Sequence, residues 1–177
     1  MTVVSPIRTT PSSKPPLFSF PNPVNEISAR LVAAGIVIMA LVTILFDLNW
    51  FTVVIAYGFW ARVLAGPTLS PLGLFVTQVI TPRLGLEPRF VAGPPKRFAQ
   101  LVGVIFSTTA LVLTFVFDEW FAAQVVLGML AGAAFLESAF GLCLGCKAFA
   151  LLMRVGVIPE DVCERCNNLW GDARSAV

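Results

Sequence analysis

The segment from Ile27 to Phe46 reads ISARLVAAGIVIMALVTILF, and only Ser28, Arg30 and Thr43 interrupt its apolar run. A helix needs about 20 mainly apolar residues to cross the hydrocarbon core of a bilayer. The segment therefore predicts a membrane-spanning helix over residues 27–46, and this prediction sets the class of the whole chain.

Three further apolar segments, at about 50–65, 98–117 and 120–142, predict three more spanning helices. The composition agrees, because 57% of the residues are hydrophobic and only 12% are charged, about half the charged share of a typical globular domain. The expected fold is an all-α integral membrane protein whose four transmembrane helices form two hairpins.

The remaining segments flank or connect these spans. Residues 1–24 contain six prolines and predict a disordered N-terminal tail before a membrane domain at 25–146. Within the central loop, at about 66–97, apolar residues recur every three or four positions, which predicts a helix lying in the membrane interface. Residues 147–177 predict a short cytoplasmic helical hairpin, built from about 147–156 and 159–169.

The charges predict the orientation of the chain in the membrane. The turns at 47–49 and 118–119 contain only acidic charges, whereas all twelve basic residues lie toward the opposite ends of the spans. Because Lys and Arg accumulate in cytoplasmic loops, both termini and the central loop are expected in the cytoplasm, with the chain in the inner membrane.

Both predicted hairpins turn at similar sequences. Leu45-Phe46-Asp47 is followed by Trp50-Phe51, and Val116-Phe117-Asp118 is followed by Trp120-Phe121. Duplication of a two-helix unit explains the similarity, since parallel repeats are common in membrane proteins. Features shared by any two membrane hairpins explain it equally well.

Two features of the fourth predicted span concern packing and charge. Gly128 and Gly132 form a small-xxx-small face, which we expect to pack within the bundle. Glu137 is the acid inside a predicted span, at about the level of Arg62. An intramembrane acid is a functional candidate, but such residues usually pair, so an Arg62–Glu137 ion pair is the expected structural role.

All four cysteines form C-x-x-C pairs, Cys143/Cys146 and Cys163/Cys166, separated by sixteen residues. The predicted C-terminal hairpin would bring the two pairs together at the cytoplasmic face of the membrane. A C-x-x-C pair favours the thiolate and supports thiol–disulfide exchange. In a reducing cytoplasm such disulfides would be transient.

The same spacing also fits a metal site. Cys143, Cys146, Cys163 and Cys166 could hold zinc in a tetrahedral four-thiolate site, or an iron–sulfur centre. In a third interpretation, Cys143 and Cys146 are small apolar residues that pack a helix end. The chain has no histidine, which excludes His-ligated haem and imidazole catalysis. A net charge of +2, without a basic aromatic patch, gives no indication of nucleic-acid binding.

Several short motifs of this sequence resemble motifs found in a known protein family. These are Ala65-Gly66-Pro67, Pro82-Arg83-Leu84-Gly85, Pro95-Lys96-Arg97-Phe98 and Gly141-Leu142-Cys143-Leu144-Gly145-Cys146. Over about residues 22–152 the chain resembles the bacterial membrane-protein family catalogued as domain of unknown function 4395, which has no settled activity. The resemblance implies thiol or sulfur chemistry with a soluble thioredoxin-like or rhodanese-type partner, and its shared motif includes only Cys143 and Cys146.

These patterns favour a membrane-anchored thiol–disulfide or sulfur-relay protein. Cys143 and Cys146 would form the pair at the membrane edge, Cys163 and Cys166 the exposed pair that meets the partner, and Glu137 would accept a proton from a nearby thiol. The alternative is a non-enzymatic accessory subunit of a larger membrane complex, with zinc or iron bound by the four cysteines.

Overall fold

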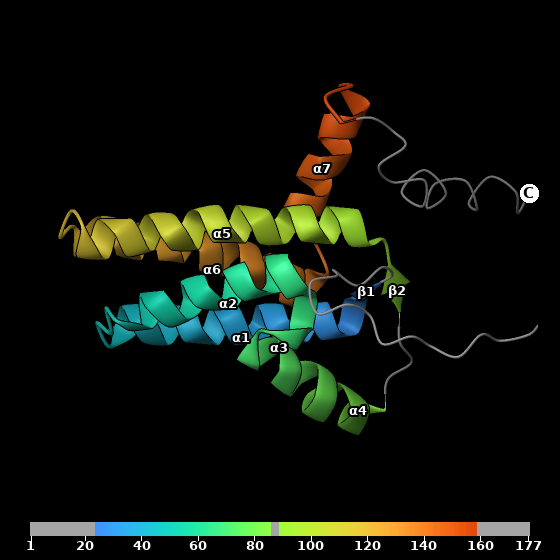
Figure 1. Ribbon diagram of the computed structural model, residues 1–177, viewed down its shortest axis with the longest axis horizontal. Coiled ribbons are helices and arrows are strands. Elements are labelled where there is room, and N and C mark those ends of the chain that lie inside the picture. Colours follow the sequence, from blue (N-terminus) through green and yellow to red (C-terminus); the bar gives the residue numbers. More distant parts are fainter. Residues whose placement is uncertain (1–23, 86–88, 159–177) are drawn as a thin grey trace, which may run out of the picture.

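The structure is a computed structural model, and it describes residues 24–85 and 89–158. Four long helices run side by side, α1 (Glu26–Leu45), α2 (Phe51–Ala65), α5 (Gly93–Phe115) and α6 (Trp120–Phe140) (Figure 1). By length and composition the helical segments can cross a membrane four times, with the second candidate span running from α2 to Leu84. The predicted all-α fold with four spanning helices is confirmed, and the chain is a multi-pass membrane protein.

The four helices pack around one apolar core. Helix α1 packs mainly on α6, α2 packs on α5, and α5 also contacts α6, so the two hairpins lie against each other. Ile36, Ile55, Phe59 and Leu127 are buried at the centre. Large apolar side chains such as Ile38, Ile105 and Phe121 are exposed on the outside of the bundle, which suits a surface in contact with lipid rather than water.

The two hairpin turns adopt the same unusual backbone conformation. Asp47 has φ 50° and Asp118 has φ 54°, a left-handed region that Asp tolerates better than most residues. Asp47 Oδ1 also accepts hydrogen bonds from Trp120 Nε1 and Gln124 Nε2, both at 2.8 Å. This matching geometry at equivalent positions agrees with the sequence repeat, and the hydrogen bonds connect one hairpin to the other.

The glycines of α6 do not pack within the bundle. A Cβ atom added at Gly128 or Gly132 would meet no atom within 4 Å, so the expectation of internal packing is wrong. The close helix contact lies instead at Gly103 of α5, where an added Cβ would be 2.1 Å from Cε1 of Phe59. The sequence pattern indicated a face of small residues but not the direction in which that face points.

The segment after α2 leaves the bundle as a separate helical arm (Figure 1). The chain turns at Gly66–Thr68 (η1) and continues through α3 (Pro71–Phe75), the π-helical η2 (Val76–Ile80) and α4 (Thr81–Leu84). Val76 is buried against the bundle. The central loop thus contains helix, and its position at the membrane interface stays a prediction.

A short antiparallel pair joins the start of α1 to the end of the central loop. In it β1 (Val24–Asn25) pairs with β2 (Phe90–Val91), so that Val24 faces Val91. This pairing places the start of α5 beside the start of α1. Both helices therefore begin at one end of the bundle, which we call the basic end because Arg30 and Lys96 lie there.

The helix α7 (Leu144–Arg154) follows α6 and runs across the direction of the bundle, against α5 (Figure 1). Phe149 is its buried anchor and contacts Phe98 with a ring-centroid distance of 5.6 Å. The partner helix expected at about 159–169 lies outside the described residues. The predicted C-terminal hairpin is therefore described only through its first helix.

Candidate functional site: a dithiol at the junction of α6 and α7

The site begins where α6 ends. Gly141 has φ 68°, and its N–H donates to the Glu137 carbonyl at 3.0 Å while the Leu142 N–H donates to the Leu136 carbonyl at 3.1 Å. The bond from Gly141 to Glu137 is that of an αL C-cap, which a glycine at the left-handed position favours. The turn ends α6 and sends the chain across the basic end of the bundle toward α5.

Arg30 of α1 stabilises the same turn. Its Nη2 donates to the carbonyls of Ser138 and Ala139 at 3.1 and 3.0 Å, and its Nε donates to Ser138 at 3.2 Å. The last carbonyls of a helix lack partners within the helix and carry partial negative charge. The Arg30 guanidinium therefore provides hydrogen-bond donors for the last carbonyls of α6 and holds this end of the helix beside α1.

Cys143 is the N-cap residue of α7. Its Sγ accepts a hydrogen bond from the Cys146 backbone N–H at 3.3 Å. Cys143 is buried and Cys146 is half-buried, and both are free thiols. A capping atom accepts one of the helix N–H groups that has no partner in the helix. The C-x-x-C spacing is therefore built into the first turn of α7.

Gly145 lets this first turn lie directly on α5. A Cβ added at Gly145 would be 2.5 Å from Cα and 2.6 Å from Cβ of Ala99, distances that real Cβ atoms do not reach. A side chain at position 145 would displace the turn that holds both thiols. The sequence G-x-C-x-G-C thus combines a helix stop, a cap and a close contact.

A Gly145→Ala variant is expected to lose about 1–3 kcal/mol of unfolding free energy, because the added methyl overpacks the contact with Ala99. The alkylation rate of Cys143 should change with it, since α7 must shift. Thermal unfolding in detergent and alkylation kinetics measure the two effects. Gly128→Ala is the matched control, because its methyl enters open space. If Gly145→Ala and Gly128→Ala had the same stability and the same Cys143 alkylation rate, the close contact between Gly145 and Ala99 would be contradicted.

An ion pair between α5 and α6 lies next to the dithiol. Lys96 Nζ contacts Glu137 Oε1 at 2.5 Å, and both side chains are largely buried. The expected Arg62–Glu137 pair is therefore wrong. Arg62 instead donates to Gln100 Oε1 at 2.9 Å and to Ser70 Oγ at 3.2 Å. Because α2 packs mainly on α5, Arg62 reaches Gln100 of that helix.

The interaction between the two cysteine side chains makes their thiols chemically unequal. Interaction with the Cys146 side chain lowers the pKa of Cys143, and the positive charge of Lys96 lowers it further, against burial and the charge of Glu137. The same interaction raises the pKa of Cys146, and burial adds to the effect. The arrangement thus favours the thiolate at Cys143 and the protonated thiol at Cys146.

The structure brings together three of the predicted site residues, Cys143, Cys146 and Glu137. Cys143 and Glu137 also line one cavity of about 180 Å³ between α5 and α6. Sequence reasoning missed Lys96 as a site residue, although a lysine at the start of a predicted span was a usable signal. Cys163 and Cys166 lie outside the described residues. Over 24–85 and 89–158, no three Cys, Asp or Glu side chains converge as a metal site.

In the comparison with known protein families, one family model matches the chain. The family model described as Domain of unknown function (DUF4395) matches residues 24–154. The matched range includes Cys143 and Cys146 and ends before Cys163. Among curated proteins and solved structures, none matches the chain.

Proposed function

This chain belongs to the family called Domain of unknown function (DUF4395), and we propose that it is a membrane-anchored thiol–disulfide or sulfur-relay protein that reacts through Cys143. The observation that carries the proposal is the position of Cys143, whose Sγ caps α7 and accepts the Cys146 N–H. Helix N-termini and C-x-x-C motifs both favour a reactive thiolate.

Exchange proceeds in two steps. The Cys143 thiolate attacks one sulfur of a partner disulfide, so that a mixed disulfide forms and the partner's other sulfur leaves as a thiolate. Cys146 then loses its proton and attacks Cys143 Sγ. The Cys143–Cys146 disulfide forms, the second partner thiolate leaves, and two electrons have passed from this protein to the partner. The same steps in reverse oxidise a partner dithiol.

Sulfur relay uses the same first residue. The Cys143 thiolate attacks the outer sulfur of a donor persulfide, the donor S–S bond breaks, and the donor leaves as a thiolate. Cys143 then holds the persulfide, which an acceptor thiolate removes by the same exchange. Both reactions need a thiolate at Cys143 and differ in whether Cys146 closes a disulfide.

Lys96 and Glu137 have complementary roles in this proposal. The positive charge of Lys96 favours the Cys143 thiolate, whereas the carboxylate of Glu137 opposes it. Glu137, which contacts Lys96 through Oε1, is proposed to accept the proton that Cys146 releases. In this proposal Lys96 stabilises the negative charge of the Cys143 thiolate, and Glu137 takes up the proton when Cys146 becomes a thiolate.

The protein is proposed to lie in the inner membrane with both termini and the basic end in the cytoplasm. Charge supports this, because Asp47, Asp118 and Glu119 lie in the turns at the other end, and Lys and Arg favour the cytoplasmic side. An impermeant maleimide should label Asn49→Cys from outside intact cells. If Asn49→Cys were labelled only after lysis, this turn would lie in the cytoplasm and the proposed orientation would be wrong.

The proposed partner is a soluble thioredoxin-like or rhodanese-type protein, as the family resemblance implies. Cys163 and Cys166 are proposed as an exposed pair that also meets this partner, beside the direct attack by Cys143, and that exchanges with Cys143 and Cys146. The location of the dithiol at the end of the bundle supports a reaction with a soluble protein, because chemistry at the bundle centre would be enclosed by helices.

Reduction of insulin disulfides with dithiothreitol as electron source tests the proposal. The purified protein is expected to accelerate the reaction, and Cys143→Ser made together with Cys163→Ser and Cys166→Ser is expected to return it to the uncatalysed rate. Metal analysis of the same sample tests the accessory-subunit alternative. One equivalent of zinc or iron that is lost in Cys166→Ser, together with no acceleration by the intact protein, would overturn the proposal in favour of a metal site.

A further inference from the structure

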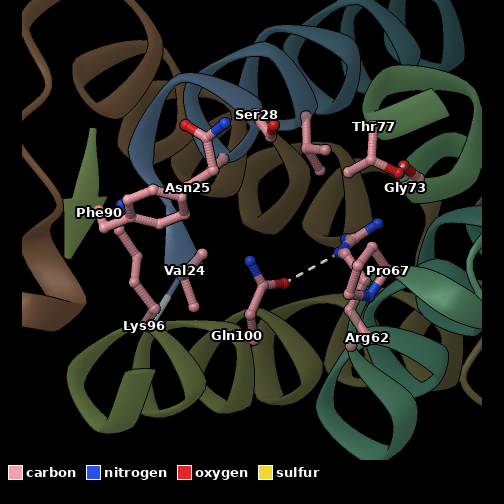
Figure 2. A pocket seen from close by; sticks show the side chains of 13 residues that line it. Val24, Asn25, Ser28, Arg62, Pro67, Gly73, Thr77, Phe90, Lys96 and Gln100 are labelled. Carbon is pink, nitrogen blue, oxygen red and sulfur yellow. Dashed lines mark hydrogen bonds between the residues drawn. The ribbon is translucent and has the colours of Figure 1, made fainter. Parts of the chain in front are cut away.

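A second cavity lies at the basic end, beside Lys96 and away from the dithiol. It has a volume of about 270 Å³ and is lined by residues of β1, α1, α2, the helical arm, β2 and α5. Figure 2 shows the side chains of Arg62, Lys96 and Gln100 reaching toward this space from α2 and α5, with Asn25 and Ser28 on the opposite side. Of the described groups in the proposed thiol reaction, only Lys96 lines this cavity.

Arg62 is held rigidly at the wall of the cavity. Its Nε donates to Gln100 Oε1, its Nη1 donates to Ser70 Oγ, and its Cζ lies 4.5 Å from the centroid of the Phe59 ring. Arg62 is only 5% exposed. Within the described residues its Nη2 has no hydrogen-bond partner. A buried cationic donor without a partner is unfavourable unless an acceptor arrives.

The shape of the guanidinium identifies the missing acceptor. One N–H of Nη2 points in the same direction as the Nε–H, and together they form a fork that matches two oxygens of one anion. A single amide oxygen from Gln100 occupies the Nε position of this fork and leaves Nη2 unsatisfied. An oxyanion in the cavity would take the place of Gln100 Oε1 and satisfy both nitrogens, while the rotated Gln100 amide donates to it.

The charges around the cavity define the charge of the ligand. Lys96 is paired with Glu137, so its charge is compensated. Arg62 makes no ion pair within the described residues, and Glu137 acts on it only from a longer distance. One positive charge therefore remains for the cavity. The other lining residues include the apolar Val32, Pro67 and Phe90, which suit an apolar body behind the charged group.

We propose that this cavity binds a singly charged oxyanion, a carboxylate or a phosphodiester, carried on a short apolar group. Two sources have this chemistry, a soluble organic acid and the headgroup of an acidic phospholipid. Arg62 binds the oxyanion through Nε and Nη2, and Gln100 exchanges from acceptor to donor as it enters. Lys96 lines this cavity and also pairs with Glu137 next to the dithiol, so it connects the two sites.

The test measures the melting temperature of the full-length protein at low ionic strength. Hexanoate added in an uncharged detergent probes the soluble source, and nanodiscs with phosphatidylglycerol, compared with phosphatidylcholine alone, probe the lipid source. At a ligand level about 100 times the Kd, a saturable rise of about 5 °C is expected. A rise with hexanoate identifies a soluble acid, and a rise with phosphatidylglycerol alone identifies a lipid headgroup.

Four variants separate the site from general charge effects. Arg62→Gln should remove the rise, and Ala29→Leu should remove it by filling the cavity with Arg62 intact. Gln100→Glu supplies an internal carboxylate, so it should raise the melting temperature without any probe and abolish the response to both. Arg97→Gln is the control, since Arg97 is exposed at the same end of the bundle. The proposal is overturned if neither probe acts on the wild type, or if Arg97→Gln loses the response as fully as Gln100→Glu.

Discussion

A Cys146→Ser variant is expected to accumulate a covalent mixed disulfide with its partner protein, whereas a Cys143→Ser variant is expected to accumulate none. Cys143 provides the attacking thiolate, because its Sγ caps α7 and accepts the Cys146 N–H. Without the Cys146 thiol, the second exchange step cannot release the partner. Non-reducing electrophoresis followed by mass spectrometry of the cross-linked band gives the result.

The trapping experiment needs a background in which the second pair cannot react. Both variants are therefore made with Cys163→Ser and Cys166→Ser, so that any cross-link passes through the described pair. Addition of dithiothreitol should release the partner from the Cys146→Ser protein. A trapped partner on Cys143→Ser in place of Cys146→Ser would reverse the assigned roles of the two thiols.

Substitutions in the Lys96–Glu137 ion pair are expected to shift the pKa of Cys143 in opposite directions. Lys96→Met removes a positive charge that lowers this pKa, so the pKa rises. Glu137→Gln removes a negative charge that raises it, so the pKa falls. Each change also leaves one largely buried charge without its partner, at a cost of about 3–5 kcal/mol in unfolding free energy.

The two effects can be separated by experiment. The pH dependence of Cys143 alkylation reports its pKa, and thermal unfolding reports stability. A merely structural ion pair would lower stability in both variants and leave the pKa of Cys143 in place. The double variant Lys96→Met/Glu137→Met should recover part of the stability, because no unpaired charge is left in the contact.

The four spanning helices could be predicted because a run of about 20 apolar residues has few other folded solutions. The turns were also predictable, since Asp47 and Asp118 interrupt these runs next to Trp50 and Trp120. Hydropathy gives the depth of a residue along the membrane normal but not the direction in which its side chain points. For this reason Gly128 and Gly132 were placed in the bundle, although they face outward.

The same limit explains the wrong partner of Glu137. Arg62 and Lys96 both lie at the basic end, so depth alone could not choose between them. The choice follows from helix order, because α6 packs on α1 and α5, whereas α2 packs mainly on α5. Cys143 and Cys146 were identified from their spacing, but the cap at Cys143 depends on the left-handed turn at Gly141, which ends α6 two residues earlier.

The central claim is that the first turn of α7 lowers the pKa of Cys143 and raises the pKa of Cys146. Alkylation by iodoacetamide across a pH series, with each cysteine quantified separately by mass spectrometry, measures this most directly. We predict that Cys143 titrates below the usual cysteine pKa of about 8.5 and Cys146 above it. Both cysteines titrating together near that usual value would contradict the claim.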